Sequence, residues 1–272
     1  MRPAEIFGKF PHTRQAAWQQ LTLFVTGWFG LHTPDDGVPD SDILATERRL
    51  GLELPPAVRE AYHLFGNRVE ITNAVCLLTP IQELVIQNGA LIVWFDPDDH
   101  TIWGIPKERL LEADPPVRVG SASPHDPQGG LWRDTQERFS QFFVDRALYE
   151  AVEASLYSGL AELGSDTRAI VEQNFTRLDF PDGLYPIAPT RLYGGEDALI
   201  VVEGTHSMTI GAPTYEGYRR AMAPFADLDW SAVTEEDACN GPFMERLEAK
   251  AFIQDLIDEC GAEVVRRMRE IC

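Results

Sequence analysis

The hydrophobic pattern of this chain first changes its period close to Gly66. Before that point, apolar residues recur at helical spacing, as in Trp18, Leu21, Val25 and Trp28. After it, short segments rich in β-branched and aromatic residues lie between Pro, Gly and Asp, at 75–79, 91–96, 101–105 and 117–119. Helices followed by a run of strands predict an α+β fold, with a mixed, mainly antiparallel sheet packed by helices.

A further helix, predicted for about 135–152, is anchored by Phe139, Phe142 and Phe143 and closes a first domain at residues 1–156. Residues 157–272 predict an α/β C-terminal extension that packs on this domain. Within the extension, we expect segment 180–193 to supply edge strands or cover for the same sheet. Its other expected elements are a helix near 166–175, strands near 191–193, 198–203 and 207–212, and helices near 214–223 and 242–258.

Segments 90–106 and 198–213 resemble each other, since both contain ALIV followed by TI, Gly and Pro. Either an internal duplication or the convergence of two hairpins on one pattern explains the similarity.

The net charge limits the kind of partner. The chain has 43 acidic residues against 23 Lys and Arg, a formal net charge of −20. Binding to nucleic acid depends on Lys and Arg that neutralise phosphates, so a direct nucleic-acid ligand is excluded. The natural counterpart is a protein with a basic surface.

The cysteines and the hydropathy indicate the cellular compartment of the protein. Four cysteines lie far apart without a C-x-x-C pair, which favours reduced thiols over zinc or disulfides and is typical of the cytoplasm. No segment approaches the roughly 20 apolar residues of a membrane span. We therefore expect a cytoplasmic protein without membrane contact.

No pattern of catalytic residues stands out. The six histidines are scattered, and no nucleophile elbow, phosphate-binding loop or dinucleotide fingerprint occurs. The sequence predicts neither an enzyme nor a cofactor.

The densest acidic cluster lies in the turn between two predicted strands, where Asp96, Asp98 and Asp99 precede His100. Such a turn could bind a hard cation. However, Asp and Pro are turn formers and the glycine and glutamate of a calcium loop are absent, so we expect no metal. An exposed turn would instead present a dense group of carboxylates to a partner, with Asp35 and Asp36 as a second cluster.

Two motifs in the first domain resemble the SUKH superfamily, which includes the yeast Smi/Knr cell-wall regulators and many bacterial immunity proteins. The first motif is an apolar residue, a Glu four later, Leu-Gly, a spacer and Leu-Pro, followed by a helix that ends in Phe-Gly-Asn at 65–67. Its residues here are Ile43, Glu47, Leu50, Gly51, Leu54 and Pro55. The second motif is an apolar strand followed across a turn by Trp-Gly-Ile, here Trp103, Gly104 and Ile105.

The resemblance implies a SUKH-like α+β domain without known catalytic chemistry. It further implies an immunity-type protein that binds and neutralises a toxin, with a basic nuclease as the expected target. A regulatory scaffold like the yeast branch is the alternative. Trp103 and Gly104 are expected to be structural, because a glycine inside a strand weakens it unless another group approaches closely.

Overall fold

The computed structural model describes residues 2–96, 101–121, 132–185 and 188–225. The chain divides into two compact units, Met1–Leu228 and Asp229–Cys272, and all described residues belong to the first. The helix expected near 242–258 therefore lies outside the described residues. The domain boundary expected at residue 156 stays a prediction.

Helices form the N-terminal part of the first unit. Thr13 caps the longest of them, since its Oγ1 accepts a hydrogen bond from the Ala16 amide at 3.2 Å. The helix predicted around Trp18 and Trp28 is confirmed. The elements are α1 (Pro3–Phe7), α2 (Arg14–Phe29), the 3₁₀ helix η1 (Pro34–Asp36), α3 (Asp40–Leu50), α4 (Pro56–Phe65) and α5 (Val69–Thr72).

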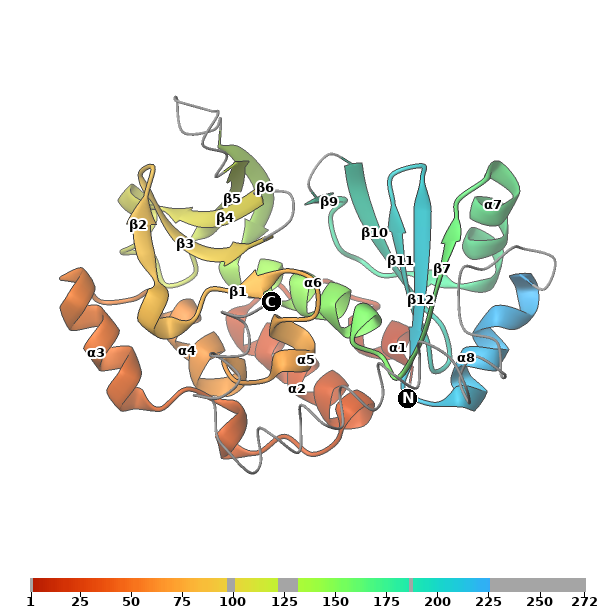
Figure 1. The fold of residues 1–272 in the computed structure, drawn as a ribbon, viewed down its shortest axis with the longest axis horizontal. Coiled ribbons are helices and arrows are strands. Elements are labelled where there is room, and N and C mark those ends of the chain that lie inside the picture. The colour runs from red at the N-terminus through yellow and green to blue at the C-terminus, as the bar shows by residue number, and fades with distance from the viewer. Residues whose placement is uncertain (1, 97–100, 122–131, 186–187, 226–272) are drawn as a thin grey trace, which may run out of the picture. The chain divides into compact units, whose positions relative to one another are not determined.

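The first sheet follows these helices (Figure 1). Its strands are β1 (Leu77–Leu78), β2 (Val85–Gln87), β3 (Ala90–Phe95), β4 (Thr101–Pro106), β5 (Pro116–Ser121) and β6 (Arg133–Arg138). Their order is β1-β3-β4-β5-β6, and β2 also pairs with β3. Every pairing between these strands is antiparallel, and the predicted α+β class is confirmed.

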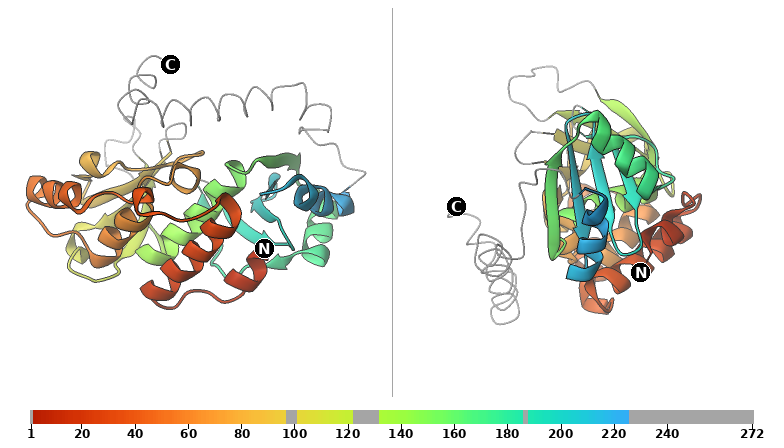
Figure 2. Two further views of the ribbon diagram at one scale, coloured as in Figure 1. Left: turned by 90° about the horizontal axis from the view of Figure 1, so that it is seen from below. Right: turned by 90° about the vertical axis from the view of Figure 1, so that its right-hand side faces the viewer.

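The helix expected to begin at residue 135 begins instead at Phe139, because 133–138 form β6. This helix, α6 (Phe139–Glu153), is buried along almost its whole length. It packs against α2, α4 and α5 and also against β5, β6, β11 and β12. Figures 1 and 2 show it between the N-terminal helices and the strands.

A second antiparallel sheet follows α6, with the order β7-β12-β11-β10-β8 and with β9 paired to β10. Segment 180–193 contributes β9 and much of β10 to it, so the expectation that this segment supplies edge strands to the first sheet is wrong, whereas the alternative that it covers the first sheet stays a prediction. The elements are β7 (Tyr157–Glu162), α7 (Ser165–Asn174), β8 (Thr176–Arg177), β9 (Gly183–Tyr185), β10 (Ala188–Gly194), β11 (Leu199–Glu203), β12 (Ser207–Ala212) and α8 (Tyr215–Met222).

The two similar segments 90–106 and 198–213 each contain an antiparallel hairpin, β3–β4 and β11–β12. Each hairpin lies in a different sheet, and the duplication stays a hypothesis.

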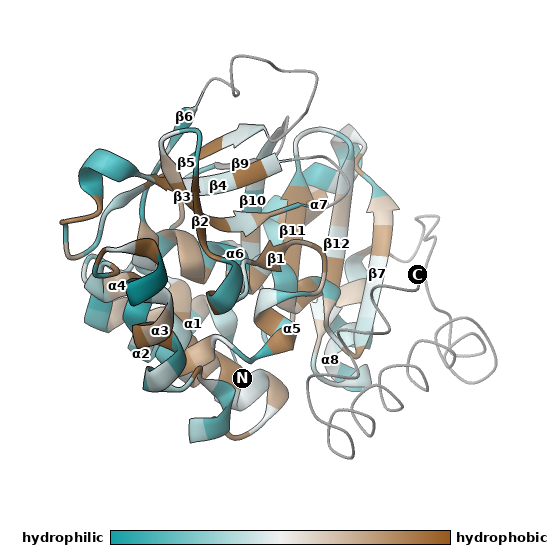
Figure 3. Cartoon of the chain, turned by 60° about the vertical axis from the view of Figure 1, so that its left-hand side comes forward, coloured by the Kyte–Doolittle hydropathy of each residue, from teal (hydrophilic) through white to brown (hydrophobic). Residues whose placement is uncertain are grey.

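One hydrophobic core joins these layers. The rings of Trp94 and Trp103 on the first sheet pack against Phe142 of α6, with centroids 6.1 and 6.2 Å apart. Phe143 contacts Trp18 of α2 on the other side, at 5.7 Å. Brown stretches in Figure 3 follow several strands, including β2, β7 and β11. Among the described helices, none has the length and apolar character needed to cross a membrane.

Candidate functional site

Glu47 fixes the link between α3 and α4. Its side chain is buried, with 7% of the residue exposed. Oε1 accepts hydrogen bonds from the Leu54 amide at 2.8 Å and from Arg59 Nη1 at 3.1 Å. These charge-assisted bonds offset the burial of the carboxylate. Glu47 therefore holds together α3, the linker and α4.

The other residues of the first motif shape the same corner. Gly51 ends α3 in the left-handed region, with a φ of +68°, and its amide donates to the Glu47 carbonyl. Ile43, Leu54 and Pro55 are buried, and Leu50 is half-buried. The motif thus encodes a rigid helical corner.

Trp103 and Gly104 of β4 pack against neighbouring side chains. Trp103 is buried against α6. A Cβ atom on Gly104 would lie 2.9 Å from Cβ of Ala90 and 3.0 Å from Cη2 of Trp132. Glycine is required there because Trp132 and Ala90 leave no room for a side chain.

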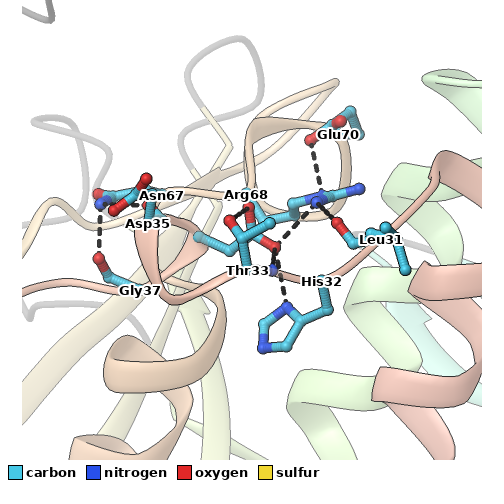
Figure 4. A network of polar contacts seen from close by, with 9 residues as sticks. Leu31, His32, Thr33, Asp35, Gly37, Asn67, Arg68 and Glu70 are labelled. Atoms are coloured by element: carbon cyan, nitrogen blue, oxygen red, sulfur yellow. Dashed lines mark hydrogen bonds and ion pairs between the residues drawn. The ribbon is translucent and has the colours of Figure 1, made fainter.

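A polar network that includes His32, Thr33 and Arg68 lies at the end of η1 (Figure 4). Asp36 is its centre. Its Oδ2 accepts hydrogen bonds from the Thr33 amide at 2.9 Å and from Arg68 Nη1 at 2.8 Å. His32 Nδ1 lies 2.9 Å from the same oxygen. Burial acts against the Asp36 carboxylate, but the Thr33 amide and Arg68 outweigh it and lower the pKa of Asp36.

Further contacts attach η1 to the end of α4. Asn67 Nδ2 donates to the Gly37 carbonyl at 2.7 Å, and the Asn67 amide donates to the Asp36 carbonyl at 2.9 Å. Gly37 itself packs so closely on His63 that a Cβ would overlap the His63 carbonyl oxygen. Asp36 is therefore a structural residue that holds η1 in place.

Acidic residues surround this rigid segment. Asp35 is exposed in η1, while the exposed Asp40 and the half-buried Asp42 occupy the first turn of α3. The Asp40 side chain is 71% exposed, and its Oδ1 lies 3.4 Å from His63 Nδ1 at the end of α4. We call Asp35, Asp40 and Asp42 the acidic surface.

Asp96 does not lie at an exposed position, although the sequence analysis expected it to. Asp96 is buried, with 4% of the residue exposed, and its amide donates to the Thr101 carbonyl at 2.8 Å. The backbone pairing between β3 and β4 thus continues one residue past β3 and includes Asp96. Asp98 and Asp99 lie outside the described residues.

Buried charges on α6 are the feature that the sequence analysis missed. Arg146 donates to Asp145 Oδ2 from Nη2 at 2.8 Å, and both residues are buried. The Arg146 guanidinium also lies 5.0 Å from the ring centroid of Tyr149 and 5.8 Å from that of Trp103. The sequence held a signal for this burial. In a helix over 139–152, apolar residues lie on every face, which is typical of a fully buried helix.

Glu150, one turn after Arg146, holds the segment between α5 and β1. Its Oε2 accepts from the Ala74 and Val75 amides at 2.7 and 2.6 Å, and its Oε1 accepts from the Cys76 amide at 3.0 Å. Burial raises the pKa of Glu150 to about 7, against the three amides and Arg146, which lower it.

Metal ligands do not gather in the part of the chain that the structure describes: no group of three His, Cys, Asp or Glu there is placed to hold an ion. Comparisons with protein-family models, with curated proteins and with solved structures give no match to this chain. The fold and the described residues define an α+β protein that presents an acidic surface on a rigid helical corner.

Proposed function

We propose that this chain is an immunity-type protein, which binds a toxin with a basic surface and neutralises it by covering that surface. A nuclease is the toxin class that fits best. The observation that carries the proposal is the acidic surface of Asp35, Asp40 and Asp42 beside the Asp36–Arg68 network. The resemblance of the α3–α4 motif to the SUKH superfamily supports the same function.

The physical argument concerns complementary charge. A nuclease is basic where it holds nucleic acid, because phosphate binding depends on Lys and Arg. At physiological ionic strength the Debye length is about 8 Å, so only grouped charges act together on an approaching surface. A net charge of −20 adds long-range steering toward a basic partner.

Rigidity favours tight binding. The acidic surface lies on η1 and on the start of α3, and the Asp36, Asn67 and Gly37 contacts already order this backbone in the free chain. Little conformational entropy is then lost on binding. The proposal requires no catalytic group and no cofactor, and it places the chain in the cytoplasm. Asp98 and Asp99 stay a proposed second contact.

A neutralisation assay tests the proposal. The genes adjacent to the gene for this chain are searched for a secreted toxin with a nuclease domain, and cleavage of DNA and RNA by that purified domain is followed with increasing amounts of the chain. We expect inhibition that is complete near one chain per toxin and that weakens steeply from low to high ionic strength.

Two results would reject this function: cleavage that is unaffected by excess chain, or binding without inhibition. Binding that leaves cleavage intact and does not depend on salt would favour the regulatory scaffold.

A further inference from the structure

The turn between β2 and β3 (Figure 1) consists of an Asn-Gly pair, Asn88 and Gly89. Gln87 pairs with Ala90, so the loop has two residues, and φ is +50° at Asn88 and +78° at Gly89. A two-residue loop with both φ values positive is a type I′ turn, for which Asn-Gly is a preferred sequence. Both turn residues are exposed to solvent.

An Asn-Gly pair is chemically reactive. The backbone nitrogen of Gly89 can attack the side-chain amide carbon Cγ of Asn88, because glycine has no side chain to hinder the approach. A bond forms between this nitrogen and Cγ, ammonia leaves, and a five-membered succinimide ring results. Water then opens the ring at either carbonyl and yields aspartate or isoaspartate, so the reaction needs no reagent besides water.

The turn geometry opposes ring closure. In the succinimide ring, the Gly89 nitrogen and the Cβ atom of Asn88 lie on the same side of the bond between Cα and the carbonyl carbon of Asn88. A type I′ turn has a ψ of about +30° at its first central residue, which holds these two atoms on opposite sides of that bond. Asn88 therefore reacts only after rotation about this bond, and the rotation moves its carbonyl oxygen.

Trp132 holds this carbonyl oxygen in place. Its indole Nε1 donates a hydrogen bond to the Asn88 carbonyl at 3.0 Å. The indole ring lies closely against two glycines of the first sheet. A Cβ on Gly120 would lie 2.9 Å from Cε3 of the ring, and a Cβ on Gly104 would lie 3.0 Å from Cη2. The donor is thus positioned by packing before it meets its acceptor.

We propose that Asn88 is a site of spontaneous deamidation and that Trp132 sets the rate of the reaction. The reaction proceeds from the locally opened state in which the Trp132 hydrogen bond is broken, because only then is the Asn88 carbonyl free to rotate. The inference concerns the first sheet alone and is independent of the acidic surface and of the proposed toxin.

The products alter the hairpin. Aspartate adds a negative charge to the turn. Isoaspartate also adds a backbone atom, since its main chain runs through Cβ, and Gln87 then no longer lies opposite Ala90. Deamidation therefore loosens β2, whose only pairing among the described strands is with β3.

Mass spectrometry of peptides from the incubated full chain measures the conversion of Asn88 to aspartate and isoaspartate. A capped Gln-Asn-Gly-Ala tetrapeptide, which has the same sequence without the fold, gives the unrestrained rate. We expect the wild type to react about tenfold or more slowly than the tetrapeptide. Asn88→Gly keeps the type I′ turn without the side-chain amide, so the signal should disappear and is thereby assigned to Asn88.

Two variants release the Asn88 carbonyl in different ways. Trp132→Phe keeps an aromatic ring but has no donor, and Gly120→Ala displaces the indole with a methyl group. Each should react about fivefold faster than the wild type, which is the factor expected for the loss of one hydrogen bond. Trp103→Phe changes the opposite face of the same sheet, toward α6, and is the control that should react as the wild type does.

The proposal is overturned if the wild type reacts as fast as the tetrapeptide. It is also overturned if Trp132→Phe and Gly120→Ala, with melting temperatures that show both to be folded, react no faster than the wild type. If Gly120→Ala does not fold, Trp132→Phe alone decides. Equal acceleration in Trp103→Phe would overturn it as well, because general loosening of the sheet and not Trp132 would then set the rate.

Discussion

Removing the Glu150 carboxylate should detach the segment before β1 from α6. In Glu150→Ala, the amides of Ala74, Val75 and Cys76 lose their acceptor. The Cys76 amide belongs to a fully buried residue, and an unsatisfied buried donor costs about 1–3 kcal/mol. Ala74 is exposed and Val75 half-buried, so their amides reach water and cost about 1 kcal/mol each.

At about pH 4.5, where the contribution of Glu150 to stability is still fully present, these three losses together should lower the free energy of unfolding by about 3–5 kcal/mol. That is a large part of the stability of an ordinary domain, which is about 5–15 kcal/mol. Urea denaturation followed by the fluorescence of the buried Trp94 and Trp103 measures the change.

Amide hydrogen exchange locates the effect. The amides of Ala74, Val75 and Cys76 should lose protection in Glu150→Ala more than amides elsewhere do. Glu162→Ala, at an exposed position of β7, is the matched control and should change stability by less than about 0.5 kcal/mol. If Glu150→Ala unfolds within about 1 kcal/mol of the wild type, the three hydrogen bonds do not stabilise this segment as argued.

Three further perturbations follow from the structure. The folded chain holds the Glu150 proton more tightly than the unfolded chain does. The contribution of Glu150 to the free energy of unfolding is therefore fully present below about pH 4.5 and falls by about 3 kcal/mol as the pH rises to about 7. Urea unfolding across this range should give a flatter profile for Glu150→Gln, and parallel profiles would contradict the raised pKa. Trp103→Ala should lower the free energy of unfolding by about 3–5 kcal/mol, and a melting temperature unchanged within about a degree would disprove its core role. Gly104→Ala should lower it by about 1–3 kcal/mol through overlap with Ala90 and Trp132, with partial rescue by Trp132→Leu, and a variant as stable as the wild type would show that the sheet accommodates the methyl group.

Local pattern was enough to predict much of the fold. The helical spacing of Trp18 to Trp28 predicted α2, and the β-branched run at 91–96 predicted β3. These elements bury their own apolar residues, so the period of the sequence reports directly on the structure.

The missed features depend on contacts between distant residues. Segment 133–138 consists mostly of charged and polar residues, and it is a strand because it pairs with β5. Asp36 looked like a surface charge because its partner Arg68 lies 32 residues away. Asp145 and Glu150 are acidic residues in a buried helix, and only their partners show why they are tolerated there.

The association rate of the purified toxin domain with acidic-surface variants tests the central claim most directly. The triple variant Asp35→Asn, Asp40→Asn, Asp42→Asn removes three negative charges from the acidic surface. Glu162→Gln, Glu172→Gln, Glu216→Gln removes the same charge from exposed positions on β7, α7 and α8. At low salt, the first variant should associate on the order of tenfold more slowly than the wild type, with a nearly unchanged dissociation rate, while the control associates normally. Equal slowing of both variants would show that net charge alone steers the partner, and an unchanged rate for the folded first variant would show that the partner binds elsewhere.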